Sequence, residues 1–273
     1  MIKFNLTSLV ASLAIVSSLT LTGCGGGGGD TNSNATANTE DTDTSTDDTN
    51  LSEFEITLTA AEMIHTSDED EYKDKIIDPY PYVPEITQVA IDAYLQAVNE
   101  QRVKGADCHT RGVFPAVKPL IWNAKLYSAA QEHNYDMINA KEVVGVDENL
   151  GDNGYIGHGG SGTDTDWTAT QWNLNARSSY TQRAYNNGYD SFVVLENVAI
   201  YSKNFVSDQP SEIEKARQAV KMWMESDGHC ATIMYSPTDS FPQIEENIQG
   251  EMGMGYTKNP NDSYVWGYVI GFR

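Results

Sequence analysis

The sequence predicts an α+β domain in which an antiparallel sheet lies between layers of helices. Segments with the 3.6-residue apolar spacing of helices are interleaved with a few apolar runs of strand length. The last two strand candidates are joined by the turn sequence NPNDS at 259–263, which favours an antiparallel pair. Elements mixed in this way favour a sheet covered by helices. Residues 87–273 are enough for one such domain and show no internal repeat.

Four segments are predicted as helices because apolar residues recur in them at helical spacing. They cover residues 87–103, 123–140, 179–187 and a stretch that begins after Pro210, a residue tolerated at a helix start. In the second helix, His133 lies on the apolar face. A histidine placed there is usually a buried, hydrogen-bonded core residue, so we assign it no chemistry.

Four further segments are predicted as strands from their apolar, β-branched and aromatic residues. They are GYIGH at 154–158, FVVLENVAIYS at 192–202, EMGMGYT at 251–257 and YVWGYVIGF at 264–272. Glu196 interrupts the second run. Because a buried carboxylate needs a partner, this residue is a candidate for a functional site, and a nearby imidazole is a natural partner.

The amino terminus has the features of an export signal. Lys3 is followed by an apolar run from Leu6 to Leu21 that is too short and too rich in Ser and Thr for a permanent membrane span. The sequence LTGC, which ends at Cys24, resembles the lipobox of bacterial lipoproteins. We therefore expect residues 1–23 to be a signal peptide, Cys24 to be acylated, and the protein to lie in the bacterial cell envelope. The alternatives are cleavage elsewhere and an uncleaved anchor.

Residues 24–86 are predicted to be a disordered tether. The stretch from 25 to 86 holds five consecutive Gly residues and 16 of the 39 acidic residues, with only Lys73 and Lys75 as bases. Such a composition buries too little apolar surface to offset its ordering entropy. About 60 residues of this kind span on the order of 40 Å. One segment, Phe54 to Ile64, is apolar enough to order.

The charge of the chain excludes one class of partner. The formal net charge is −22, and residues 87–273 hold 23 acidic against 14 basic residues. Nucleic-acid binding needs concentrated Lys and Arg, so we expect no nucleic-acid partner. An anionic membrane is likewise not expected to bind the domain directly, so membrane association should come from the lipid on Cys24.

Four segments, taken in order, resemble the CAP or SCP domain of the cysteine-rich secretory, antigen 5 and pathogenesis-related 1 superfamily. They are LIWNAKLYSAAQEHNYDMINA at 120–140, YIGHGGSG at 155–162, LENVAI at 195–200 and WMESDGHCATIM at 223–234. The resemblance covers about residues 87–273 and implies a three-layer α-β-α sandwich. The connection around 163–177 looks longer than is usual for the family.

The resemblance also implies a central cavity lined by His158, Glu196 and His229. The resemblance implies that this cavity could hold a divalent ion, zinc or another, and neutral imidazoles with a carboxylate suit zinc. Glu225 is the candidate for a fourth cavity residue, although many relatives carry the acid one position later, where this chain has Ser226. The simpler alternatives are that His158 is a loop residue bonded to backbone and that His229 caps the fourth helix.

Two cysteines remain after lipidation of Cys24, and an even pair in an exported protein is usually bonded. The resemblance supports a bridge between Cys108 and Cys230. The alternative is a pair of buried free thiols.

Three functions fit these patterns. The first is a surface lipoprotein whose CAP domain binds a ligand: a metal, a lipid or sterol, or a protein partner. The second is a hydrolase of peptide or cell-wall substrates, for which Ser161, His158 and Glu196 would form the nucleophile, base and acid. However, GGSGT is not the G-x-S-x-G elbow of serine hydrolases. The third is an adhesive surface protein in which the cavity has no role.

Overall fold

The computed structural model describes residues 56–60, 72, 74–141, 143, 148–149, 154–191, 193–201, 210–237, 248–258 and 264–273. The predicted signal peptide, Cys24 and most of the predicted tether therefore lie outside the described residues, as does the turn at 259–263. Among the described residues, no helix has the length and apolar character needed to cross a membrane.

A five-stranded sheet forms the centre of the fold, in the order β1-β7-β9-β8-β4. Its strands are β1 (Ile56–Ala60), β4 (Ile121–Trp122), β7 (Val193–Tyr201), β8 (Gly250–Lys258) and β9 (Tyr264–Phe272). Every pairing is antiparallel except that of β4 with β8. Two short hairpins lie outside the sheet: β2 (Ala106–Asp107) with β3 (Val113–Phe114), and β5 (Glu148–Asn149) with β6 (Tyr155–Ile156).

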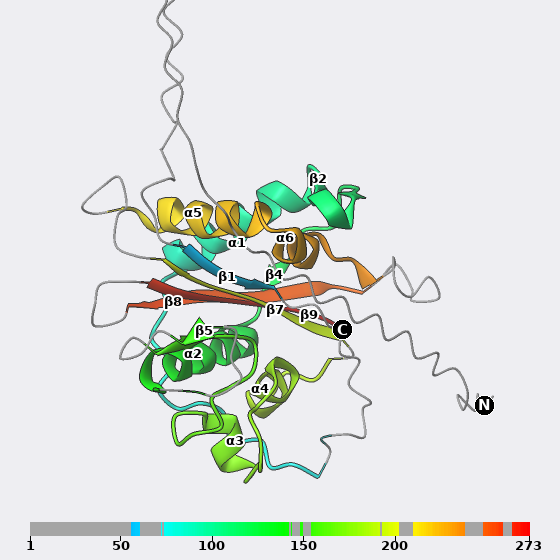
Figure 1. Cartoon of the computed structure of the whole chain (residues 1–273). Coiled ribbons are helices and arrows are strands. Elements are labelled where there is room, and N and C mark those ends of the chain that lie inside the picture. Colours follow the sequence, from blue (N-terminus) through cyan, green and yellow to red (C-terminus); the bar gives the residue numbers. More distant parts are fainter. Residues whose placement is uncertain are drawn as a thin grey trace, which may run out of the picture. The chain divides into compact units, whose positions relative to one another are not determined.

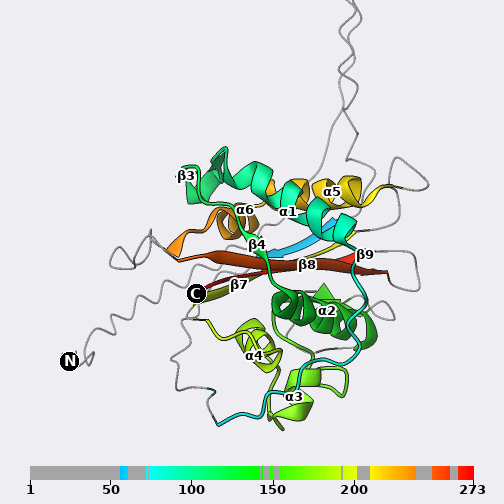
Figure 2. The same cartoon turned by 180° about the vertical axis from the view of Figure 1, so that it is seen from behind.

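Helices cover both faces of the sheet, as Figures 1 and 2 show. One layer holds α1 (Gln88–Arg102), α5 (Glu212–Met224) and α6 (Asp227–Met234), and the 3-10 turn η2 (His109–Arg111) lies against α6. The other layer holds α2 (Ala124–Asn139), α3 (Trp167–Gln171) and α4 (Tyr180–Asn186). The predicted α+β fold, a three-layer α-β-α sandwich with a small antiparallel sheet, is confirmed.

Local sequence explains where the predicted helices begin. The side chains of Thr87, Asn123, Ser179 and Ser211 each accept a hydrogen bond from a backbone N–H in the first turn of α1, α2, α4 and α5. At α4 and α5 the caps are reciprocal, because Gln182 and Glu214 bond back to the N-cap residue. The boundaries of α1, α2 and α4 agree with the predicted ranges to within about two residues, and α5 begins after Pro210 as predicted.

The helix that carries His229 differs from the prediction. The sequence places His229 at the end of the fourth helix, with capping of that helix as the simpler alternative to a cavity role, but α5 ends at Met224 and the separate helix α6 begins at Asp227. Ser226 has extended backbone geometry between them, which breaks the helix. The residue therefore lies inside a second helix and not at the cap of the first.

Glycines allow α2 to lie directly on the sheet. A Cβ atom added to Gly253 would come within 1.9 Å of the backbone nitrogen of Tyr127, and one added to Gly255 would come within 2.2 Å of the side-chain nitrogen of Gln131. Both glycines lie on β8, where the backbone of α2 at Gly253 and side chains of α2 at Gly255 occupy the space that a side chain on the strand would fill. This close approach fixes the position of α2, and with it the position of His133.

Part of the predicted tether belongs to the folded domain. Residues 74–86, which we call the strap, run in largely irregular geometry onto α3 and α4. The indole N–H groups of Trp167 and Trp172 donate to the carbonyls of Asp78 and Ile76 at 2.8 and 3.0 Å. Tyr80, inside the strap, is only 5% exposed.

Two asparagines of α4 and its C-cap hold the strap at its backbone. Asn186 accepts from the Asp78 N–H at 3.0 Å and donates to its carbonyl at 2.9 Å, while Asn187 accepts from the Tyr80 N–H at 3.1 Å. Strand β1, also within 24–86, pairs with β7 at the edge of the sheet. β1 lies in the segment 54–64 that the sequence marks as apolar enough to order. The strap departs from the expected disorder, because aromatic burial and backbone hydrogen bonds offset its ordering entropy.

Candidate functional site

Glu196 is the centre of a buried polar cluster between the sheet and the α2–α4 layer. Side chains alternate along β7, so Val194, Glu196 and Val198 share one face while Leu195 and Ala199 face the α1–α5–α6 layer. The Glu196 side chain is 1% exposed. An ionised carboxylate buried so completely requires compensating partners.

Arg183 of α4 is the principal partner of Glu196. One guanidinium nitrogen lies 2.9 and 3.1 Å from the two carboxylate oxygens of Glu196, and its own side chain is 1% exposed. Burial is the largest single influence on Glu196 and opposes its ionisation, but the charge of Arg183 together with His133 and His158 outweighs it and lowers the pKa of that carboxyl to about 2. The guanidinium also donates to the backbone carbonyls of Ser178 and His158 at 3.1 and 2.9 Å.

Two histidines complete the cluster. His158, in the loop after β6, places Nδ1 3.2 Å from Glu196, and its side chain is 16% exposed, so it is the only one of the four groups that reaches toward solvent. His133 of α2 places Nε2 3.7 Å from Glu196 and 2.7 Å from the carbonyl of Gly157. Burial, followed by the charge of Arg183, lowers the pKa of His133 to about 4, so this imidazole is neutral near pH 7.

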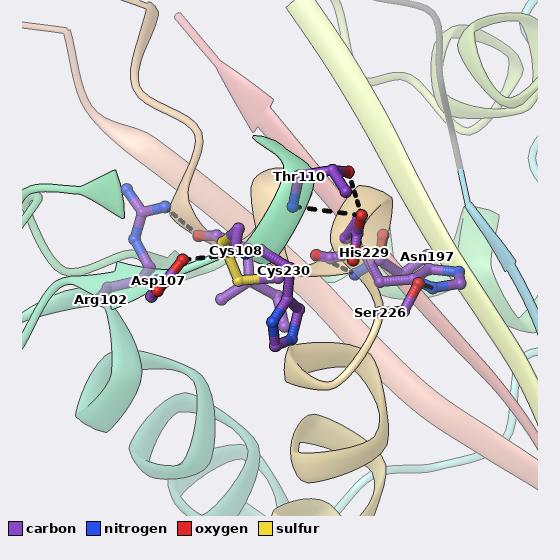
Figure 3. Close-up of a disulfide and its surroundings, with 11 residues drawn as sticks. Arg102, Asp107, Cys108, Thr110, Asn197, Ser226, His229 and Cys230 are labelled. Carbon is purple, nitrogen blue, oxygen red and sulfur yellow. Dashed lines mark hydrogen bonds between the residues drawn. A yellow bond between two sulfur atoms is a disulfide. The ribbon is translucent and has the colours of Figure 1, made fainter. Parts of the chain in front are cut away.

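His229 lies in the opposite layer from the partners of Glu196. Its Nδ1 is 2.8 Å from the Ser226 hydroxyl, and its backbone carbonyl accepts from the Asn197 side chain at 3.1 Å (Figure 3). Burial, followed by nearby His158, lowers its pKa to about 3. Within the described residues, His229 forms no hydrogen bond or ion pair with His158 or Glu196.

Glu225 is not in this cluster. It is exposed at the C-cap of α5 and lines a surface hollow of about 420 Å³ between α1 and α5, together with His109 and Lys221. Of the predicted cavity residues, the structure thus brings together His158 and Glu196, keeps His229 across the sheet, and places Glu225 at a different surface.

Cys108 and Cys230 are bonded to each other, as predicted, with their Cα atoms 5.4 Å apart. The bridge ties the segment before η2 to α6, one residue from His229 (Figure 3). Two further contacts hold the same region: Thr110 bonds to the Asp227 carboxylate, and buried Arg102 donates to the carbonyls of Ile233 and Tyr235. The position of His229 is therefore strongly constrained.

The model of the Cysteine-rich secretory protein family, CAP, matches residues 95–271. The chain belongs to the CAP family. No curated protein and no solved structure matches it.

In this CAP domain, the hydroxyl of Ser161 is not directed at a histidine. Its Oγ lies 2.6 Å from Asp136, 2.8 Å from Thr163 and 3.4 Å from Thr165, and its backbone N–H also donates to Asp136. Asp136 thereby fixes the loop after His158. The arrangement of Ser161, His158 and Glu196 as nucleophile, base and acid has no support in these contacts.

The predicted divalent ion does not fit the side chains as they are arranged. Among the described residues, no three His, Cys, Asp or Glu side chains are grouped so that they could hold one ion. Both oxygens of Glu196 are bonded to Arg183, whose positive charge would oppose a cation beside them.

Two members of the cluster, His133 and Arg183, are not predicted from the sequence as site residues. His133 lies on the apolar face of α2, where we expect a core residue, and it is indeed buried, but its ring contacts Glu196. Arg183 lies in a short helix without any motif around it. The only available signal is that an arginine on the inner face of a capped helix requires a buried acid, and Glu196 is the acid that interrupts an apolar strand.

Proposed function

We propose that the chain is a lipid-anchored protein of the bacterial cell envelope whose extracytoplasmic CAP domain binds a ligand and does not hydrolyse one. The proposal rests on one observation: the charged and polar side chains around Glu196 are already paired with each other. The Glu196 carboxylate is neutralised by Arg183, and the hydroxyl of Ser161, the candidate nucleophile, is held by Asp136. A hydrolase would need a nucleophile or an activated water beside His158.

The class of ligand follows from the family resemblance: a lipid or sterol, or a protein partner at the envelope surface. The predicted acyl chains on Cys24 would retain the domain at the membrane, and the residues between Cys24 and β1 would separate the domain from the membrane surface. The domain itself is acidic, which supports anchoring by lipid over anchoring by charge.

One observation favours hydrolysis as the second candidate. His158 Nδ1 lies 3.2 Å from Glu196, the arrangement in which a carboxylate orients an imidazole as a general base. The test uses the mature chain from residue 24, with Cys24→Ser so that it is soluble, incubated with denatured proteins and with cell-wall fragments. We expect no cleavage products by mass spectrometry. Products that disappear in His158→Ala would establish the hydrolase.

Binding is tested separately by native mass spectrometry of the same protein after incubation with an envelope lipid extract or with a sterol. A stoichiometric mass adduct supports the binding function. The absence of adducts with both, together with cleavage in the first experiment, would exclude it.

A further inference from the structure

The negative charge of Glu196 is compensated by a side chain of the protein, the guanidinium of Arg183. We propose that the Arg183 guanidinium takes the place of a divalent metal ion in the buried cluster, so that the cluster binds no such ion and Arg183 is its positioning residue. The inference holds whether the domain binds or hydrolyses its ligand, because it concerns only what compensates the charge of Glu196.

The first argument concerns the lone pairs that a metal would need. A zinc ion binds carboxylate oxygens at roughly 2.0 to 2.2 Å. Both oxygens of Glu196 already accept from Arg183, and one of them also faces His158 and His133. An ion could bind there only if the guanidinium moved away from the carboxylate.

The second argument is that Arg183 is held in place independently of Glu196. Its guanidinium donates to the Ser178 carbonyl and hydroxyl and to the His158 carbonyl. It lies at 1% exposure, so no solvent is available to receive it if it were displaced. Displacement would leave a buried charge without its partner, which is strongly unfavourable.

The third argument concerns the nitrogens of the histidines. The Nε2 of His133 lies 2.7 Å from the Gly157 carbonyl, which can only accept, so that nitrogen carries the proton and is not a metal ligand. The Nδ1 of His229, on α6 in the opposite layer, is paired with Ser226. The other ring nitrogens, His133 Nδ1 and His229 Nε2, are buried without hydrogen-bond partners, but among the described residues no three His, Cys, Asp or Glu side chains are grouped so that they could hold one ion.

Arg183 also explains how His158 is oriented. A single guanidinium nitrogen bonds both to the His158 backbone carbonyl and to the carboxylate that receives His158 Nδ1. The backbone and the ring of this residue are thus fixed through the same group. A structural metal ion would orient the His158 ring in the same way, and removal of the ion would release the ring.

The experiment measures metal binding by four versions of the mature chain, each with Cys24→Ser. They are the wild-type cluster, Arg183→Gln, Arg183→Lys as the charge-preserving control, and Arg183→Gln combined with His158→Ala. Cobalt is titrated while the visible absorption of tetrahedral sites is recorded, and zinc is then used to displace it. Circular dichroism first establishes that each variant is folded.

We expect only weak, nonspecific cobalt binding to the wild type and to Arg183→Lys. Arg183→Gln, in which the amide can still donate to Glu196 but carries no charge, should bind at least about 100-fold more tightly, the order expected when a like charge at short range is removed. The gain should be lost when His158→Ala is added. A folded Arg183→Gln protein with unchanged affinity would overturn the proposal.

If Arg183→Gln does not fold, the wild type is compared with Glu196→Gln. Equal, weak cobalt affinity in the two proteins supports the proposal. A tetrahedral cobalt spectrum in the wild type that is lost in Glu196→Gln or His158→Ala would show a metal site at the cluster and would refute it. Neither result bears on the cleavage and lipid-adduct experiments, so the two proposals can fail separately.

Discussion

Arg183 and Glu196 form an ion pair from which water is excluded, and such pairs respond very differently to single and double substitution. Removing one partner leaves the other charge buried, so Arg183→Met and Glu196→Met should each lower the free energy of unfolding by about 3–5 kcal/mol. The double variant should recover most of this loss, because two apolar side chains of similar volume replace the pair. Urea unfolding of the four proteins measures the coupling. Additive losses would show that the pair does not act as a unit.

The buried histidines predict how stability depends on pH. His133 and His229 have folded pKa values of about 4 and about 3, below the ordinary value of 6.5, so between pH 6.5 and pH 4 the unfolded chain binds protons that the folded chain does not. Stability should therefore fall as the pH falls, by about 1.4 kcal/mol per pH unit for each histidine. Glu132 opposes this between about pH 4.5 and 7, because burial raises its folded pKa to about 7.

Between about pH 5 and 6.5, the net dependence of the free energy of unfolding on pH should therefore correspond to about one proton, or about 1.4 kcal/mol per pH unit. His229→Gln should reduce it to about zero, because His133 and Glu132 then cancel. The measurement is the free energy of unfolding at several pH values between about 5 and 6.5. The exposed His109→Gln variant is the matched control and should leave the slope unchanged. A slope unaffected by His229→Gln would mean that this ring is not held neutral by burial.

At the scale of the elements, the parts of the fold that the sequence predicts are those with a strong local signal. Caps and apolar periodicity place α1 and the start of α5 closely, and the apolar, aromatic and β-branched run YVWGYVIGF matches β9 at 264–272. The missed elements lack such signals. β4 has two residues, α3 has five, and the strap is ordered by Trp167 and Trp172, which are distant from it in sequence.

The same distinction applies to the site. Glu196 is predictable because a charge in an apolar strand is locally conspicuous, and His158 because it resembles a family position. The partnership with Arg183 depends on which face of α4 meets which face of β7, and that is a tertiary property. The position of Glu225 depends on where α5 ends, a boundary that sequence patterns place only to within a few residues.

The strap offers a matched pair of tyrosines to test whether it belongs to the domain. Tyr80 is 5% exposed and Tyr82 is 71% exposed, two positions apart in the same segment. Tyr80→Ala should destabilise the domain by about 3 kcal/mol, the usual cost of truncating a buried aromatic side chain. Tyr82→Ala should cost about 0.5 kcal/mol or less. The measurement is the thermal unfolding of the two variants. Equally small effects of both substitutions would show that the strap does not contribute to the stability of the domain.

Because α2 lies so close to the sheet, we expect Gly253 to tolerate no larger residue. Gly253→Ala would place a methyl group 1.9 Å from the Tyr127 backbone nitrogen, which cannot move without displacing the helix. We expect a loss of more than about 3 kcal/mol. Gly159→Ala is the control, because its added carbon would meet the Arg177 side chain at an ordinary 3.5 Å. Comparable urea midpoints for the two variants would contradict this packing.

At the scale of the whole molecule, the chain joins an acidic domain to a segment that lies outside the described residues and ends at a predicted lipid anchor. The domain carries more acidic than basic residues, so its own charge opposes adsorption to anionic lipids. A disulfide that holds α6 requires an oxidising compartment during folding. Both features agree with export followed by anchoring through lipid.

Acylation of Cys24 is the corresponding prediction. LTGC follows an apolar run of export-signal length, so the mature chain should begin at Cys24 and carry covalent acyl chains, which together retain a protein at a membrane far more firmly than one chain does. Intact mass spectrometry of the protein from its membrane fraction should give the mass of residues 24–273 plus the lipid. Cys24→Ser should move the protein to the soluble fraction or leave the signal peptide attached.

Because residues 87–273 are unchanged in this variant, its CAP domain should unfold at the same temperature as the wild type, which separates loss of the anchor from loss of the fold. An unmodified amino terminus at any other position would refute the prediction.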